Sequence, residues 1–296
     1  MRLIEEKALK AALNPVRTSV AIQQDPKSGI QRPSRFRFIE EHDGEGWKPL
    51  AVGTESYRLL DNRLAVEAIQ ILSDRHRLGL APARAFAHKG DGGQFTSALA
   101  VGGRTRMVFT SESLRYRVDG DGSDVCPTVA FDNDYAKGMR GKLGTGAWRY
   151  VCSNLMLWEG EFASEQTLIH MGAKGQGSFT LEEIVAWIEP GFKALQEKME
   201  KDKAVANLLS HATVTAELLK AIVESAPERY QERIEEAARQ SRFQIGNGLN
   251  TGWSVLQAAA EVVSHEWTRK GNATWSGQKW MDETTAALVG GLGIAV

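Results

Sequence analysis

The chain has little cysteine, almost no net charge and no long apolar run, and each of these absences excludes a class of protein. Only two cysteines, Cys126 and Cys152, occur among 296 residues, so the sequence does not encode a disulfide-dense secreted scaffold. The formal net charge is −1, which leaves no bulk positive charge to attract nucleic acid, so any such binding needs a local patch. No apolar stretch approaches the roughly 18–20 residues that span a bilayer, so no membrane partner is expected. The first residues carry acids where a secretory signal needs an apolar run, and we therefore expect a cytoplasmic protein with reduced thiols.

The motifs of the common phosphate and metal sites are missing as well. Residues 141–147 share glycines with a P-loop, but their lysine stands at the wrong end, so we interpret them as a turn before a strand. Residues 119–124 begin like a calcium loop, yet the position for its last ligand, a glutamate, holds Ala130. The six histidines and two cysteines are scattered without ligand spacing. The sequence therefore predicts no cofactor, no metal site and no catalytic residue.

One acidic pair stands apart from the exposed turns. Asp132 and Asp134 directly follow an apolar stretch at 125–131, and Asn133 lies between them. Paired carboxylates bind magnesium in nucleases, so a metal-dependent nuclease is one hypothesis for this chain. A purely structural role for the two carboxylates is the other interpretation, and the sequence favours it.

The periodicity of apolar residues changes along the chain. Residues 35–40 and 47–52 alternate like a β-hairpin after a polar loop at 24–34, and Asp61 followed by Asn62 begins a helix whose apolar face runs to residue 72. We expect a short helix in residues 1–13 and further strands at 83–88, 94–101, 105–110, 114–118, 126–132, 146–152 and 165–171. Glycines gather in this region, which suits tight turns between short antiparallel strands.

Beyond residue 175 the spacing is helical. We expect a helix capped by Ser178 or Thr180 that breaks or kinks at Pro190 and Gly191 before residues 192–209 continue it, then helices at 213–225, 228–241, 250–269 and 276–290. The sequence thus predicts an α+β fold, with an antiparallel-sheet-rich N-terminal core in residues 1–175 followed by an all-helical C-terminal part in residues 176–296. The first part holds 24 Lys+Arg against 21 Asp+Glu and the second 12 against 16, so the basic excess lies in the strand-rich part.

Basic and aromatic side chains interleave in that strand-rich part. A surface of this composition could track a phosphate backbone with its cations while its aromatic rings stack on bases. The alternative is a solvated sheet face on which arginine stems cover apolar surface. The candidate nucleic-acid-binding residues are Arg35, Arg37, Arg58, Arg104, Arg106, Lys137, Arg140, Lys142, Trp148, Arg149 and Tyr150.

Several segments resemble a phage- and plasmid-associated family, the domain of unknown function numbered 932. The resemblance runs from the Phe-Arg-Phe at 36–38 through a Tyr-x-x-x-x-Asn step, Tyr57 to Asn62, to the Asp-Asn-Asp at 132–134. Residues 149–155 are similar to the family's Arg-x-Val-Cys-Ser/Thr-Asn-Gly, except that Leu155 stands in place of the glycine. A later segment, 250–265, resembles a family helix with an aromatic residue near its start and Glu-x-x-x-His near its end.

The resemblance implies a mobile-element setting, and with it DNA replication, recombination or counter-defence. Our first hypothesis is a single-stranded-DNA-binding or strand-annealing protein that forms homo-oligomers. The alternatives are a protein-interaction or counter-defence factor without catalytic activity, and the nuclease built on Asp132 and Asp134. We also expect Cys152 to be a buried thiol and Asn154 to tie a turn through its side chain.

Overall fold

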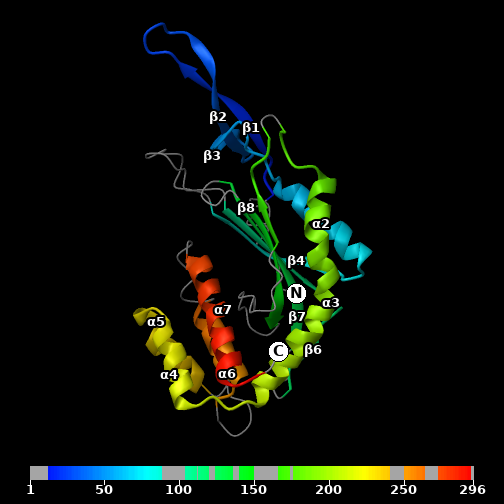
Figure 1. Ribbon diagram of the computed structural model, residues 1–296, viewed down its shortest axis with the longest axis vertical. Coiled ribbons are helices and arrows are strands. Elements are labelled where there is room, and N and C mark those ends of the chain that lie inside the picture. Colours follow the sequence, from blue (N-terminus) through cyan, green and yellow to red (C-terminus); the bar gives the residue numbers. More distant parts are fainter. Residues whose placement is uncertain are drawn as a thin grey trace. The chain divides into compact units, whose positions relative to one another are not determined.

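The computed structural model shows an α+β protein (Figure 1). It describes residues 13–88, 104–111, 113–119, 124–135, 140–149, 166–173, 176–240, 250–263 and 273–294. Antiparallel sheets occur mostly in the N-terminal half and helices in the C-terminal part. This distribution confirms the fold class predicted from the change of periodicity near residue 176.

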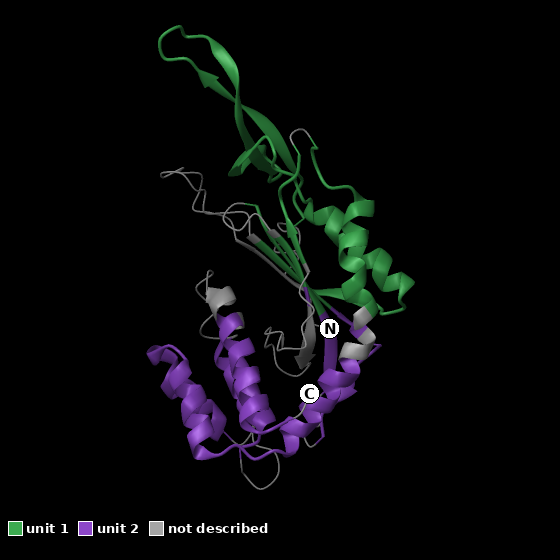
Figure 2. Ribbon diagram, in the orientation of Figure 1, with its two compact units in different colours: residues 1–109, 129–143, 165–193 green, residues 110–128, 144–164, 194–296 purple. Residues whose placement is uncertain are grey.

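The chain forms two compact units that interleave along the sequence (Figure 2). Unit 1 consists of residues 1–109, 129–143 and 165–193, and unit 2 of residues 110–128, 144–164 and 194–296. One long helix contributes to both units, so the domain boundary expected at residues 175/176 stays a prediction.

A three-stranded antiparallel sheet opens unit 1. Its strands are β1 (Val16–Gln24), β2 (Gln31–His42) and β3 (Trp47–Thr54), in the order β1-β2-β3. The polar loop predicted at 24–34 is shorter in the structure, where residues 25–30 form a turn and Gln24 and residues 31–34 belong to β1 and β2. Asp25 and Gly29 explain the difference: the Asp25 amide donates to the Ile30 carbonyl at 3.0 Å, and Gly29 supplies the positive φ of +70° that a short turn needs.

The second sheet has six strands, with the order β4-β5-β7-β8-β9 and β6 paired to β7. Every residue of β7 after Asp124 is buried, as expected for a central strand covered on both faces. Residues 141–147 lie inside β8 and are not the turn that we predicted; a Cβ on Gly141 would collide with Leu60, so glycine there allows close packing. The bounds are β4 Leu80–His88, β5 Arg104–Ser111, β6 Tyr116–Arg117, β7 Asp124–Asp134, β8 Arg140–Arg149 and β9 Gln166–Ile169.

Helix α2 (Asn62–Arg75) begins where the sequence predicts it. The Asp61 carboxylate accepts the Arg63 amide at 2.8 Å, and the buried residues Ala65, Ala68, Ile69 and Leu72 follow helical spacing. The strand predicted at 94–101 and the helix predicted at 1–13 lie outside the described residues.

Helix α3 (Leu181–His211) continues through Pro190, so of the two predicted alternatives, a break or a kink, the break is wrong. Proline removes one backbone hydrogen bond, but Ile184, Ile188 and Phe192 are buried at four-residue spacing on both sides of it. Packing of this apolar face outweighs the missing bond. The helix begins with a reciprocal cap, in which Thr180 and Glu183 each accept the other's backbone amide.

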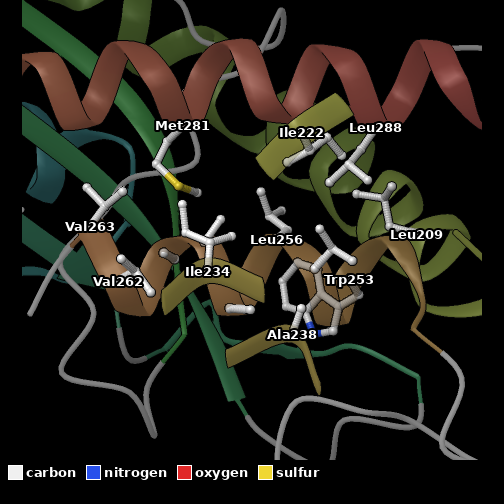
Figure 3. Close-up of a cluster of buried hydrophobic side chains, with 14 of the residues drawn as sticks. Leu209, Ile222, Ile234, Ala238, Trp253, Leu256, Val262, Val263, Met281 and Leu288 are labelled. Carbon is white, nitrogen blue, oxygen red and sulfur yellow. The ribbon is translucent and has the colours of Figure 1, made fainter. Parts of the chain in front are cut away.

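The remaining helices form the core of unit 2 (Figure 3). They are α4 (Ala216–Ser225), α5 (Glu228–Arg239), α6 (Gly252–Val262) and α7 (Ala273–Gly291). Residues 252–260 of α6 are all buried, so this helix has no solvent face and lies at the centre of the cluster. Figure 3 shows Leu256 of α6 and Met281 of α7 pointing into the same apolar cluster. No helix in the described part of the chain is long and apolar enough to cross a membrane.

Two glycines of unit 2 should respond to alanine in opposite ways. A Cβ on Gly252 would come within 2.7 Å of Leu209 and 2.9 Å of Leu292, whereas one on Gly290, inside α7, would meet nothing within 4 Å. We expect Gly252→Ala to lower the free energy of unfolding by about 1–3 kcal/mol through overpacking. Gly290→Ala should raise it by about 0.5–1 kcal/mol, because alanine loses less backbone entropy in a helix. Urea unfolding of both variants tests the pair, and equal effects would contradict the packing around α6.

Candidate nucleic-acid interface

The β1–β3 sheet has one buried and one exposed face. Cross-strand partners share a face, and the register joins Ile39 to Thr18 and Ala51. Ile39 and Ala51 are buried against Tyr57 and Leu59, so this is the inner face. The next residues along each strand point to the opposite face and form what we call the outer face.

The outer face carries large apolar side chains that remain in contact with solvent. The exposed fraction is 39% for Phe36 and 37% for both Trp47 and Val52. The pairing of Phe38 with Val52 and of Phe36 with Thr54 places both phenylalanines on this face. Aromatic rings with one free surface are what an unpaired base stacks on.

Arg17 fixes the position of Trp47 on the outer face. Its guanidinium carbon lies 4.0 Å from the centroid of the Trp47 ring, and its Nε donates to Glu40 at 2.9 Å. His42 meets the same ring edge-on, with the two ring centroids 5.2 Å apart. Trp47 is therefore held by contacts on two sides, whereas Phe36 contacts one cation, the guanidinium carbon of Arg35 lying 5.1 Å from its ring centroid.

Positive charge is concentrated on the β1–β2 ribbon. Between Val16 and Arg37 there are five cations, Arg17, Lys27, Arg32, Arg35 and Arg37, against the single acid Asp25. Asp25 closes the ribbon's turn by accepting the amides of Lys27 and Ser28 at 2.8 and 3.1 Å. These backbone hydrogen bonds lower the pKa of its carboxyl group, that from Lys27 most. No ion pair joins Arg32, Arg35 or Arg37 to an acid in the part of the chain that the structure describes.

Two arginines predicted as DNA contacts are instead held by acids inside unit 1. Arg106 is buried, with its Nε 3.6 Å from Asp132. Arg58 donates to Glu183 at 2.7 Å and to the Ser178 carbonyl at 3.2 Å, and its guanidinium carbon lies 3.9 Å from the Phe179 ring centroid. Neither guanidinium is presented to solvent in the way that Arg35 is.

The other predicted contact residues are described in part. Lys142 is half-buried in β8. The backbones of Arg104, Arg140, Trp148 and Arg149 belong to β5 and β8, but their side chains, with Lys137 and Tyr150, lie outside the described part of the structure. Arg35 and Arg37 are thus the predicted residues that the structure describes two apart on β2, with Arg35 exposed and Arg37 half-buried. Cys152 and Asn154 also lie outside it, whereas Cys126 is a buried free thiol.

Sequence reasoning missed Arg17 and Trp47. The first lies in β1, which we did not predict, and the second was treated only as the start of a hairpin strand. The available signal for β1 was a β-branched residue at every second position from 16 to 22, namely Val16, Thr18, Val20 and Ile22. The contact between Arg17 and Trp47 follows from the pairing of β1 with β2 and has no local signal.

A second polar cluster lies buried in unit 1. The Asn133 amide nitrogen donates to the Leu60 carbonyl at 3.0 Å and to the Asn62 side-chain oxygen at 2.7 Å, and the Asn62 amide nitrogen donates to Thr105 Oγ1 at 3.0 Å. The segments singled out by the Tyr-x-x-x-x-Asn step and by Asp132–Asp134 therefore meet. No group of three or more His, Cys, Asp or Glu side chains suited to a metal occurs among the described residues.

Tyr57 and His170 extend this cluster. The Tyr57 hydroxyl lies 2.6 Å from Nδ1 of His170, and both rings are buried. Burial lowers the pKa of His170 to about 4, with Asp134 opposing the shift, so the imidazole is neutral at pH 7. Burial also raises the pKa of the Tyr57 hydroxyl, which keeps its proton. A neutral, fully buried pair of this kind stabilises the fold and has no access to a ligand.

Stability should depend on pH through His170. Its pKa is about 4 in the folded chain and near 6.5 when unfolded, so the contribution is present above pH 6.5 and is lost as pH falls towards 4. We expect unfolding in urea to show a loss of about 1–2 kcal/mol between pH 7 and pH 5 that is absent in His170→Asn. Asparagine retains a polar partner for Tyr57 but does not titrate. Equal losses in both proteins would show that His170 is not responsible.

Comparison with known proteins does not place the chain in a family. No family model, no curated protein and no solved structure matches it. The resemblance carried by Tyr57, Asn62 and residues 132–134 therefore stays a prediction, and the geometry of the β1–β3 sheet is the basis for a functional conclusion.

Proposed function

We propose that the β1–β3 sheet binds single-stranded DNA without reading its sequence. The observation that carries this proposal is an exposed aromatic face next to residues 16–37, a stretch with five cations and one acid. Bases that are unpaired can stack on Phe36 and Trp47, while the ribbon's guanidinium groups neutralise the phosphates between them. Single-strand binding of this kind would serve replication or recombination on a mobile element.

Both faces of the ribbon can contribute to phosphate binding. Arg37 pairs with Gly53 and shares the face of Ile39, opposite Phe36 and Phe38. The ribbon is a single layer of polypeptide, and the Debye length is about 10 Å at 0.1 M salt. A cation on either face therefore still attracts a DNA backbone that lies along the outer face. Long arginine stems shorten the distance further.

The arrangement favours single strands over duplex. In a duplex both surfaces of each base are stacked on neighbours, so a flat aromatic face gains contact only where bases are free. Hydrogen bonds to base edges would give sequence preference, and the exposed apolar side chains of the outer face offer none. We therefore expect similar affinity for mixed sequences of equal length.

Removing ribbon cations should weaken binding and reduce its salt dependence. Arg35→Gln with Arg37→Gln should lower the slope of log K against log salt concentration by about 0.7 for each phosphate that is no longer neutralised, or about 1.4 in total. Fluorescence anisotropy with a labelled oligonucleotide at several salt concentrations measures the slope. Arg229→Gln, on an exposed face of α5 in unit 2, is the matched control and should leave the slope unchanged.

Removing the exposed ring should have a different signature. Phe36→Ala should weaken binding by about 1–3 kcal/mol with little change in the salt slope, because stacking involves no counterion release. Leu208→Ala, which removes a side chain 48% exposed in unit 2, is the matched control. The same titration with a duplex of equal length checks the preference for single strands. If neither the wild-type chain nor the variants bind DNA, the protein-interaction alternative takes the place of this proposal.

A further inference from the structure

Strand β1 is an edge strand with an open side. It lies at the end of the order β1-β2-β3, and its register accounts for partners on the β2 side only. No hydrogen bond links its other edge to any part of the chain that the structure describes. An open edge presents alternating amide and carbonyl groups that can pair with another strand.

Strand β1 has few of the sequence features that prevent an edge strand from pairing with another chain. Such edges are commonly protected by lysine, proline or inward-pointing charges, but the nine residues of β1 contain no lysine, no proline and one charge, Arg17. Val20 and Ile22 alternate with Ala21 along the strand, so they share a face, and they are 47% and 64% exposed. The β1–β2 register shifts between them, from Val20 opposite Arg37 to Ile22 opposite Pro33, with the extra residues on β2. The edge therefore combines free backbone groups with apolar side chains that gain by burial.

The sequence of β1 is complementary to itself when two copies run antiparallel. With the two-fold axis at Ala21, Val20 of each copy lies opposite Ile22 of the other, and Ser19 opposite Gln23. At both ends Arg17 then lies opposite Asp25, which places unlike charges together and no like charges. Only the Nε of Arg17 is committed to Glu40, so its terminal nitrogens can reach a second carboxylate.

We propose that this chain forms a homodimer in which β1 pairs antiparallel with β1 of a second copy, about a two-fold axis at Ala21. The partner is a second copy because the two-fold operation alone supplies the matching apolar pair and the matching charges. The pairing extends the three-stranded sheet into a six-stranded sheet across the dimer. It requires neither DNA nor the function proposed above.

Cysteine placed on the axis gives a direct test. In the proposed dimer the two copies of Ala21 lie opposite each other, whereas Ser19 of one copy lies opposite Gln23 of the other. Of these positions, only 21 therefore brings two introduced cysteines together. Treatment of Ala21→Cys with diamide, which accepts the two electrons of the thiol pair, should give at least about tenfold more disulfide-linked dimer than Ser19→Cys. The wild-type chain, with Cys126 and Cys152, sets the background. Equal cross-linking at positions 19 and 21 would overturn the proposed axis.

Charge on the apolar pair should separate the copies. Val20→Lys with Ile22→Lys places lysines opposite lysines, and we expect the mass in sedimentation equilibrium to fall from twice the chain mass to that of one chain. Ile30→Lys is the matched control, since Ile30 is also exposed, at 51%, but lies in the turn beyond the paired residues, and it should stay dimeric. Circular dichroism melting should show all three proteins folded. A wild-type monomer, or a dimer that survives the double substitution, would overturn the proposal.

Mixing two charge variants identifies the register. Ser19→Glu with Gln23→Glu places carboxylates opposite carboxylates, and Ser19→Lys with Gln23→Lys places cations opposite cations, so each protein by itself should dimerise more weakly than wild type. In an equimolar mixture a heterodimer places glutamate opposite lysine at every one of these positions, so it should form. A mixture that remains as monomeric as its components would contradict pairing at Ala21.

Discussion

The hydrogen bonds made by the Asn133 side chain hold unit 1 together. Asn133 lies near the end of the buried central strand β7, and its amide nitrogen donates to Leu60 and to Asn62, at the point where the chain enters α2. A buried amide has to find partners, and here the partners are the backbone of one connection and the first residue of one helix. The position of α2 on the large sheet depends on this contact.

The same connection holds the small sheet. Residues 55–60 leave β3 and run past β9 before they reach α2; the Arg58 amide donates to the His170 carbonyl at 3.1 Å, and Tyr57 forms a bridge with Met171. Tyr57 and Leu59 pack under Ile39 and Ala51. The inner face of β1–β3 is thus fixed by a core that the connection supplies. On the outer face, by contrast, the described side chains of Phe36, Trp47 and Val52 remain more than a third exposed.

Much of this fold could be predicted from local patterns, and the exceptions have clear physical causes. Helices α2, α4, α5 and α7 begin and end close to the predicted positions, because their caps and apolar spacing are encoded in neighbouring residues. Helix α6 begins close to its predicted start, and its predicted end at residue 269 lies outside the described residues. Pro190 is different. The hydrogen bond that it removes is evident from the sequence, whereas the burial of the α3 face that compensates for this loss depends on distant segments. Strand β1 was missed for a related reason, since its partner β2 begins in a stretch rich in proline, glycine and serine that resembles a loop.

The site could be predicted only in part. Arg35 and Arg37 lie close together because residues two apart on one strand share a face, and this spacing can be read from the sequence. Arg106 also lies two residues from another arginine, Arg104, yet it faces Asp132 on the neighbouring strand β7. The sequence of one strand does not distinguish an arginine in solvent from one that is paired with an acid. Burial depends on strand order, and strand order is a property of the whole chain.

The burial of α6 has a consequence for how unit 2 assembles. Residues 252–260 are all buried, so this short helix has little stability in water before its neighbours cover it. Helices α5 and α7 pack directly against α6, and α4 packs against α5 and α7. The stability of each helix therefore depends on the others, and the helical part should fold and unfold as one cooperative unit. The amides of α6 should then exchange with solvent only when the whole unit unfolds.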